Sequence, residues 1–485
     1  MSEPGRWQPP APGAPEQQYP QDPHGQPQYG HQQYAQQQYA QQQYAQPLPQ
    51  GNQNFAQANA QGTALSHTSE YWVHHAPDPR RKKSPGAAVK VTNLILLCAF
   101  ALITVITLAF FAISIGANVF LICGALALIP LSICVATLMW IDRWEPEPIS
   151  ALILGFCWGA GMAVITTLVV GSWVQPLLMS GASGADADMV GAVVQAPMVE
   201  ELCKGAGVLL LFFLRRKTFD GPIDGVVYAG IVAAGFAFTE NILYFGQALV
   251  ETDGATGGLI AIFVLRGLMS PFAHVMFTAT LGVCVGWAAR NGGTSLVLGA
   301  WVVGLVPAMA LHGLWNGSSF LGANFFIVYI VLQVPLFILF ILGVILLRRS
   351  EAKLTRKRLA EYVPSGWFTQ QEVPMLATGG GRRRALTWSK TFSAAPLMKE
   401  FIRLATRLAF TRQRLLVDAK GGKRGAAAGR FVSGQALEMT LLNKIAAVRS
   451  DLLGRHAATV WNLQQLQAQQ LQAHQQQNNW QPPVQ

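Results

Sequence analysis

Charged residues are scarce in this chain of 485 residues: Lys, Arg, Asp and Glu together make up 12% of the sequence, and hydrophobic residues make up 51%. Soluble globular domains carry about 25% charged residues, so this composition excludes an ordinary soluble enzyme or binding domain. The apolar residues are collected in long runs of the length, about 20 residues, that a helix needs to cross a bilayer. The composition therefore predicts a polytopic membrane protein.

Cysteine is also rare. The six cysteines all lie in apolar runs, and they are Cys98, Cys123, Cys134, Cys157, Cys203 and Cys284. They form no CxxC pair, which excludes a disulfide framework, and we expect them to be small apolar packing residues. A cleavable signal peptide is missing as well, because the first stretch of about 90 residues is polar.

The apolar runs predict an all-α fold, a membrane bundle of about eight transmembrane helices. The predicted spans cover residues 91–115, 119–141, 149–174, 189–214, 223–249, 259–289, 295–317 and 325–347. Lys and Arg concentrate in cytoplasmic loops, and here they precede the first span and follow the fourth, sixth and eighth. The intervening loops carry Asp186, Asp188, Glu251 and Asp253 without Lys or Arg. Both termini are therefore predicted to be cytoplasmic.

The chain divides into four predicted regions. Residues 1–88, rich in Gln, Tyr and Pro, are predicted to be a disordered cytoplasmic tail. Residues 89–349 form the transmembrane core, residues 350–455 a basic cytoplasmic helical region, and residues 456–485 a Gln-rich tail. From Glu351 to the last residue there are 20 Lys and Arg against 7 Asp and Glu.

Two amphipathic patterns, at residues 396–419 and 433–453, are separated by a Gly-rich segment. They predict a helical hairpin in the basic region. The hairpin could pack on itself, lie on the anionic inner leaflet or bind a cytoplasmic partner. No nucleic-acid-binding module is recognisable, so nucleic acid is not an expected partner.

Ionisable and strongly polar side chains interrupt the fourth to seventh spans. They are Glu200, Glu201 and Lys204 in the fourth span, Glu240 in the fifth, His274 in the sixth, and His312 and Asn316 in the seventh. A charged side chain at the bilayer centre costs about 3 kcal/mol on insertion scales. With a rise of about 1.5 Å per residue, the four spans place these groups in one layer, about 8–20 Å below the outer face. Arg266 falls near this layer and is expected to snorkel or to form a salt bridge.

Helical spacing places some of these residues on common faces. Glu200 and Lys204 lie four residues apart and are expected to pair, while Glu201 points about 100° away, toward a second neighbour. The same spacing joins two further pairs, which are Phe236 with Glu240 and His312 with Asn316.

Carboxylates and imidazoles that are screened from lipid are suited to activating water. A glutamate can act as general base, and His and Asn side chains can stabilise the oxyanion of a carbonyl group. Alternatively, Glu and His ligate a Zn²⁺ ion that acidifies the water, although the HExxH sequence of zincin-type enzymes is absent. The structural alternative is a buried polar network that fixes helix packing.

At these residues the sequence resembles the PrsW family of intramembrane proteases, part of the superfamily of prenyl-protein endoproteases and bacteriocin-processing membrane proteins. The resemblance covers roughly residues 91–349, and the long tails are of an actinobacterial type. The motifs that carry it are WEPEP at 144–148, EExxK at 200–204, FxxxE at 236–240 within GFAFTEN, His274, and HxxxN at 312–316.

The resemblance implies peptide-bond hydrolysis in the membrane of a bacterial cell. It gives Glu200 the role of water-activating base with Glu201 in support, and it gives Asn316 the role of oxyanion donor. It implies that Glu240, which occupies a position that is often His in the superfamily, holds water or a metal together with His274 and His312. Lys204 and Phe236 are supporting residues. Whether the site holds a Zn²⁺ cofactor is left open by the resemblance, because the superfamily includes enzymes classed as metal-dependent and others classed as metal-free.

Three functions compete at this point. The first is an intramembrane protease that cleaves a membrane-anchored protein, and the second is a proton- or ion-coupled transporter, since membrane carboxylates and histidines also form relays. Transporters often contain two repeated halves, and this sequence has no such duplication. The third, a scaffold that recruits partners through its tails, leaves the buried glutamates unexplained.

Overall fold

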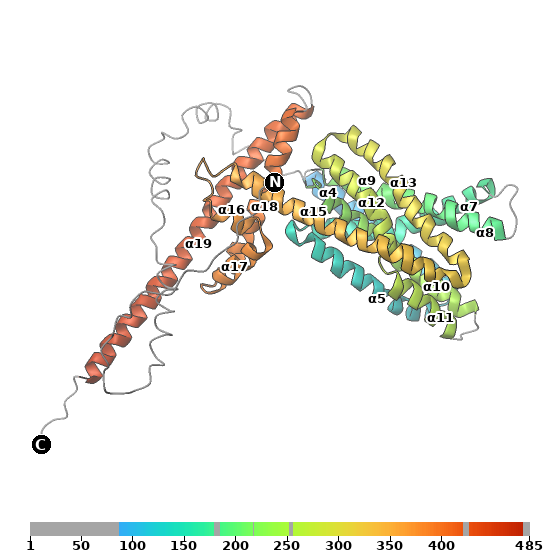
Figure 1. The fold of residues 1–485 in the computed structure, drawn as a ribbon, viewed down its shortest axis with the longest axis horizontal. Helices are drawn as coiled ribbons and strands as arrows, with labels where there is room; N and C mark the ends of the chain where they lie inside the picture. The colour runs from blue at the N-terminus through green and yellow to red at the C-terminus, as the bar shows by residue number, and fades with distance from the viewer. Residues whose placement is uncertain (1–86, 179–184, 217, 252–255, 421–425, 479–485) are drawn as a thin grey trace, which may run out of the picture. The chain divides into compact units, whose positions relative to one another are not determined.

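The computed structural model describes residues 87–178, 185–216, 218–251, 256–420 and 426–478. Within these ranges every regular element is helical, which confirms the predicted all-α fold (Figure 1). The predicted N-terminal tail, apart from its last two residues, lies outside the described residues.

The helices follow one another in three groups. The first group is α4 (Ala87–Ile115), α5 (Ala117–Ile141), η2 (Asp142–Trp144), α6 (Ile149–Cys157), η3 (Trp158–Ala163), α7 (Val164–Leu178) and α8 (Ala185–Val190). The helices that carry the predicted site residues are η4 (Gly191–Gln195), α9 (Ala196–Leu214), α10 (Pro222–Glu251), α11 (Thr256–Ile262), η5 (Phe263–Met269), α12 (Ala273–Asn291) and α13 (Thr294–Ser318). The C-terminal group is η6 (Ser319–Asn324), α14 (Phe325–Val328), η7 (Tyr329–Gln333), α15 (Val334–Ala360), α16 (Glu372–Leu376), α17 (Gly379–Lys390), α18 (Ala395–Lys420) and α19 (Ala426–Asn478).

Glycine and proline set several helix boundaries. Gly116, with φ of 87°, separates α4 from α5, and a side chain at this φ would be strained. Pro148 immediately precedes α6, where its missing N–H leaves no helical bond unmade. Pro271 lies between η5 and α12, so the predicted span 259–289 is two helical pieces rather than one. Four of the short elements, η3, η4, η5 and η7, are π-helical.

Within the described residues, six helices are long and apolar enough to cross a membrane, which supports a multi-pass membrane protein. They are Val91–Ile115, Ala117–Trp144, Ile149–Pro176, Pro222–Glu251, Thr256–Asn291 and Thr294–Ala360. The last of these is 67 residues long and contains Gly322, whose φ of 56° marks a kink between α13 and α14. Helix α9 is not among the six, and it carries Glu200, Glu201 and Lys204. The predicted count of eight therefore stays a prediction.

Helix α10 forms the centre of the membrane core. Every residue from Pro222 to Phe236 is buried, and α10 contacts α5, α6, η3, α9 and α12. Its backbone passes close to that of α12, because a Cβ atom on Gly225 would lie 1.9 Å from the carbonyl oxygen of Gly282. Small residues at such a contact let two membrane helices approach closely. This packing sets the separation between the helices that carry Glu240 and His274.

The C-terminal helices have an apolar core of their own, with Leu359, Phe401, Leu408 and Ile445 among its buried residues. Helices α18 and α19 pack against each other. Residues 421–425, which join them, lie outside the described part of the chain, so the predicted hairpin stays a prediction.

Helices run through both predicted boundaries of the basic region, and the division into regions stays a prediction. Helix α15 passes residue 349 without a break and ends only at Ala360, and α19 passes residue 455 and continues to Asn478 (Figure 1). Residues 460–472 of α19 are exposed. Gln, Leu and Ala are good helix formers, so this Gln-rich segment continues the helix even without a packed face.

The C-terminal helices contact the membrane core at the WEPEP turn. The Arg382 guanidinium lies 3.4 Å from the ring centroid of Trp144 and donates a hydrogen bond of 3.1 Å to its carbonyl oxygen. Arg414 in α18 pairs with Asp220 in the connection before α10. These contacts hold α17 and α18 against the turns at one end of the bundle.

Candidate functional site

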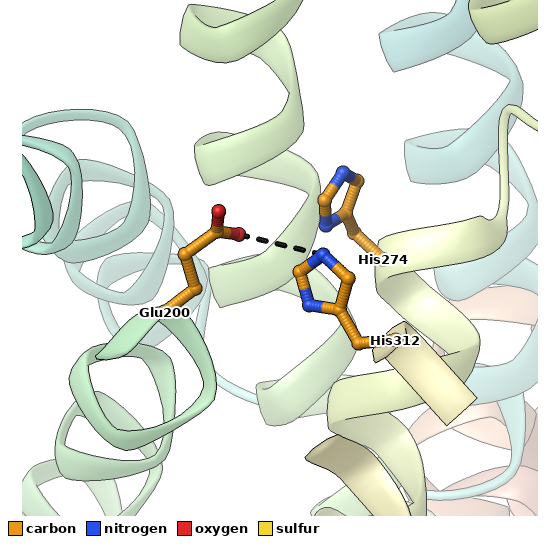
Figure 2. Close-up of side chains that lie close together, drawn as sticks. All are labelled: Glu200, His274 and His312. Atoms are coloured by element: carbon orange, nitrogen blue, oxygen red, sulfur yellow. Dashed lines mark ion pairs between the residues drawn. The ribbon is translucent and has the colours of Figure 1, made fainter. Parts of the chain in front are cut away.

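Four helices bring the predicted site residues together. Glu200, Glu201 and Lys204 lie on α9, Phe236 and Glu240 on α10, His274 at the start of α12, and His312 on α13. Figure 2 shows the carboxylate of Glu200 directed toward the imidazoles of His274 and His312. The single layer predicted from residue depth is thus a contiguous cluster of side chains.

Lys204 is the cation at the centre of the cluster, and its side chain is fully buried. Its Nζ lies 2.6 Å from Oε1 of Glu201 and 3.3 Å from Oε2 of Glu200. The same atom lies 3.3 Å from Nδ1 of His274 and 4.4 Å from the ring centroid of Phe236. The predicted pairing of Glu200 with Lys204 is confirmed, and Lys204 balances negative charge on both glutamates.

Glu201 shares Lys204 and His312 with Glu200 and has a further partner of its own, as its angular position predicted. Its Oε2 accepts a hydrogen bond of 2.8 Å from the Thr278 hydroxyl, and its Oε1 lies 3.0 Å from Nδ1 of His312. When Nδ1 of His312 donates to Glu201, the Nε2 atom is left as an acceptor, and it lies 3.8 Å from Oε2 of Glu200. Glu201 therefore orients His312 toward Glu200.

Glu240 is held by two partners. Its Oε2 lies 2.5 Å from a terminal nitrogen of Arg266 and 2.8 Å from Nε2 of His274. Arg266 also donates a hydrogen bond of 3.1 Å to Oδ1 of Asn241. Of the two roles expected for Arg266, the structure shows the salt bridge.

Three of these side chains form a group whose donor atoms all lie within 4.8 Å of one another, namely Glu200, His274 and His312. The set differs from the predicted ligands in one position, since Glu200 stands where Glu240 was expected. The reason is that the Glu240 carboxylate is turned toward Arg266. Two imidazoles and one carboxylate are a donor set found in catalytic zinc sites, which keep a fourth position for water.

The rings of the two histidines are fixed by aromatic packing. The His274 and His312 rings meet edge to face, with centroids 5.1 Å apart, and the His312 ring stacks on Phe277 at 5.1 Å and 22°. Phe236 packs against His274 at 5.8 Å. These apolar faces restrict the approach of water to the cluster.

Asn316 is directed elsewhere. Although it lies one turn from His312, its side-chain amide donates a hydrogen bond of 2.9 Å to the carbonyl oxygen of Ala192 in η4. Its role as an oxyanion donor stays a prediction.

Thr278 and Asn241 are polar partners that sequence reasoning missed. Thr278 follows His274 by four residues, and Asn241 directly follows Glu240. Helical spacing from His274 was a signal that could have found Thr278.

Comparison with known proteins gives one family. A family model described as "PrsW family intramembrane metalloprotease" matches residues 147–340, a range that contains every predicted site residue. The chain is 28% identical over 191 residues to Protease PrsW of Clostridioides difficile (strain 630), which covers 39% of this chain and 76% of that protein. It is 30% identical over 176 residues to Protease PrsW of Geobacillus kaustophilus (strain HTA426), covering 36% and 69% respectively. No solved structure matches.

Proposed function

Since the chain belongs to the PrsW family of intramembrane proteases, we propose that the cluster of Glu200, His274 and His312 hydrolyses a peptide bond in a membrane-anchored protein. The observation that carries this proposal is the convergence of the three donor groups within 4.8 Å, with all three side chains buried. No observation favours the transporter alternative.

In the proposed reaction, Glu200 is the general base. Its carboxylate takes a proton from a water molecule while the water oxygen forms a bond to the carbonyl carbon of the substrate. When the C–N bond breaks, the Glu200 carboxyl returns that proton to the leaving nitrogen. His312, held through Nδ1 by Glu201, presents Nε2 on the same side as Glu200.

Lys204 supplies fixed positive charge in this reaction. Its ammonium contacts both glutamates and lies 3.3 Å from Nδ1 of His274. A buried cation of this kind favours the negative charge that develops on the carbonyl oxygen, because charges interact more strongly in a site of low dielectric constant.

The donor set also fits a zinc ion, with Glu200, His274 and His312 as the residues that would hold it; in that alternative Glu200 would be a ligand rather than the base. A bound Zn²⁺ supplies a more acidic water and polarises the substrate carbonyl. The hydrogen bond between Glu201 and His312 resembles the outer partner that commonly orients a metal-bound histidine. Lys204 would share Glu200 with the metal, since Nζ contacts the carboxylate at 3.3 Å.

Purified full-length protein is expected to cleave single-span substrate proteins in detergent. If zinc takes part, a chelator abolishes cleavage, zinc restores it, and metal analysis finds roughly one zinc per chain. His312→Ala then loses the metal, while His456→Ala in the distant helix α19 keeps it. A folded protein that cleaves no member of a broad substrate panel would contradict the protease proposal. If metal-free protein cleaves the substrate at the same rate with and without chelator, the zinc alternative is contradicted and the protease proposal stands.

We propose further that both termini are cytoplasmic. The support is that the predicted eight crossings would place basic residues such as Arg216 and Arg290 on the same side as both chain ends, and Lys and Arg concentrate in cytoplasmic loops. In a cysteine-free background, Asp186→Cys is expected to react with a membrane-impermeant maleimide added to intact cells, and Arg216→Cys is not. Both positions are exposed, so accessibility is matched. Labelling of Arg216→Cys from outside the cell would contradict the proposed orientation.

A further inference from the structure

A cavity of about 300 Å³ lies beside the candidate site, at the lower end of the roughly 300–1,000 Å³ typical of ligand pockets. Its lining is mostly apolar and comes from four places along the chain: the end of η5, the start of α12, the last turns of α13, and η7 with the start of α15. Leu268 and Leu314 line the cavity and are 53% and 38% exposed. The cavity therefore reaches the outer surface of the bundle, where lipid and membrane-anchored proteins are found.

The cavity and the candidate site share a wall. Phe277 lines the cavity, and its ring stacks on the His312 ring at a centroid distance of 5.1 Å. Ala273, the residue before His274, lines the cavity as well. A group bound in the cavity is thus separated from His312 by about the thickness of one aromatic ring.

The cavity walls are built from interrupted helices. The π-helical segments η5 and η7 border it, and α12 begins only after the break at residues 270–272. The Tyr329 hydroxyl in η7 donates a hydrogen bond of 2.8 Å to the carbonyl oxygen of Met269 in η5 and joins the two segments. π-Helical turns are uncommon and occur frequently at functional sites.

One polar group in the cavity wall has an unused hydrogen-bond acceptor. Gln333 is buried, and its Nε2 donates a hydrogen bond of 2.7 Å to Oγ of Ser318. The Ser318 hydroxyl in turn donates to the carbonyl oxygen of Trp315 at 2.6 Å, so Ser318 can only accept from Gln333. Oε1 of Gln333 is left buried without a partner. An unsatisfied buried acceptor is destabilising, so a ligand that supplies the missing donor would stabilise this arrangement.

We propose that this cavity is a substrate-binding pocket that takes one bulky apolar side chain next to the scissile bond, while Gln333 Oε1 accepts a hydrogen bond from a backbone N–H of the substrate. The proposal rests on the proposed protease function. A transmembrane helix satisfies its own backbone groups, and an unpaired backbone group in hydrocarbon costs several kcal/mol. Cleavage requires local unwinding of that helix, and Gln333 offers a partner to one N–H group that the unwinding frees.

The unused acceptor distinguishes this occupant from a lipid. An acyl chain would fill the apolar part of the cavity, but it has no hydrogen-bond donor and would leave Gln333 Oε1 unpaired. A peptide supplies both the apolar side chain and the N–H group, so it accounts for both features of the wall.

Two variants test the pocket, one by substrate preference and the other by the overall rate. The probes are single-span peptides that carry Ala, Leu or Phe at each position around the cleaved bond. Leu311→Trp fills the cavity and is expected to shift preference from Leu and Phe toward Ala by about 10-fold or more. Gln333→Met removes the acceptor at nearly constant volume and is expected to lower kcat/KM by about 3- to 10-fold for all probes. Val306→Trp, on an exposed face of α13 outside the lining, is the matched control.

A second measurement does not depend on activity. A photo-crosslinking residue in place of Leu314, in the full chain in liposomes, is expected to form an adduct with the Leu or Phe peptide, and Leu311→Trp is expected to abolish that adduct. An adduct with lipid alone, or unchanged preference in Leu311→Trp together with unchanged kcat/KM in Gln333→Met, overturns the pocket. Peptide adducts without cleavage of any probe would contradict the protease proposal and leave the pocket standing.

Discussion

Glu200→Gln is expected to slow peptide cleavage by about 10²-fold or more, because the amide cannot take a proton from water. The substitution keeps the size of the side chain and its capacity to form hydrogen bonds. Lys204 keeps its closer partner, Glu201, at 2.6 Å, so no buried cation is left unpaired. A neutral amide is also cheaper to bury than a carboxylate. Thermal unfolding in detergent is therefore expected to change little.

The control for this variant is Cys203→Ala, one residue before the end of the Glu200–Lys204 turn. It is expected to leave the rate and the unfolding midpoint nearly unchanged. Rates come from initial cleavage of one single-span substrate at saturating and limiting concentrations. If the glutamates only hold the helices together, Glu200→Gln should disturb folding as much as activity. A well-folded Glu200→Gln protein with the wild-type rate would remove Glu200 from the role of base.

Lys204→Met is expected to destabilise the protein by about 3–5 kcal/mol, since removing one partner of a buried ion pair leaves the other charge uncompensated. Both glutamates lose the cation that contacts them, and Glu201 keeps its contacts with Thr278 and His312. Methionine fills a similar volume, so the loss does not come from a large cavity. The measurement is the free energy of unfolding in mixed detergent micelles, together with the cleavage rate.

The double variant Glu201→Gln/Lys204→Met separates the charge from the packing. It removes one negative charge along with the positive one, so it is expected to recover part of the lost stability but not the activity. Lys390→Met, in the C-terminal helix α17, serves as a control for replacing a lysine outside the cluster. Equal destabilisation by the single and double variants would show that the ion pair does not account for the loss.

The helical class was predictable from the long apolar runs of the sequence. The cluster was predictable because charged residues are costly to bury in a membrane, so the few that interrupt these runs stand out. The predicted spans 91–115 and 295–317 agree closely with α4 and α13. The spacing of Glu200, Glu201 and Lys204 was enough to predict that Glu200 pairs with Lys204 and that Glu201 turns toward a further neighbour, which is Thr278. Each residue of an α-helix is rotated by about 100° from the one before it, so the spacing in the sequence fixes the relative directions of the side chains.

The sequence could not decide which carboxylate joins the two histidines. Glu200 and Glu240 were both expected in the same layer, and each lies on a helix that faces α12. The choice depends on Arg266, whose side chain reaches across from η5 and holds Glu240. Such a reach depends on tertiary packing, and helical spacing within one span carries no information about it.

The interrupted helices were also missed. The prediction made residues 259–289 a single span. In the structure this range contains the π-helical segment η5 and the break before α12. Hydropathy responds to apolar composition, which continues through the break, and only Pro271 marks it in the sequence. The cavity beside the site is therefore a feature of the three-dimensional structure alone.

Helix α15 connects the cavity wall to the core of the C-terminal helices. Its 27 residues span about 40 Å at about 1.5 Å per residue. Val334 and Phe337 at one end line the cavity, and Leu359 at the other end is buried in the core of the C-terminal helices. If α15 moves as a rigid rod, a tilt of the C-terminal helices also moves Val334 and Phe337 in the cavity wall. The shape of the proposed substrate pocket would then depend on the position of the C-terminal helices.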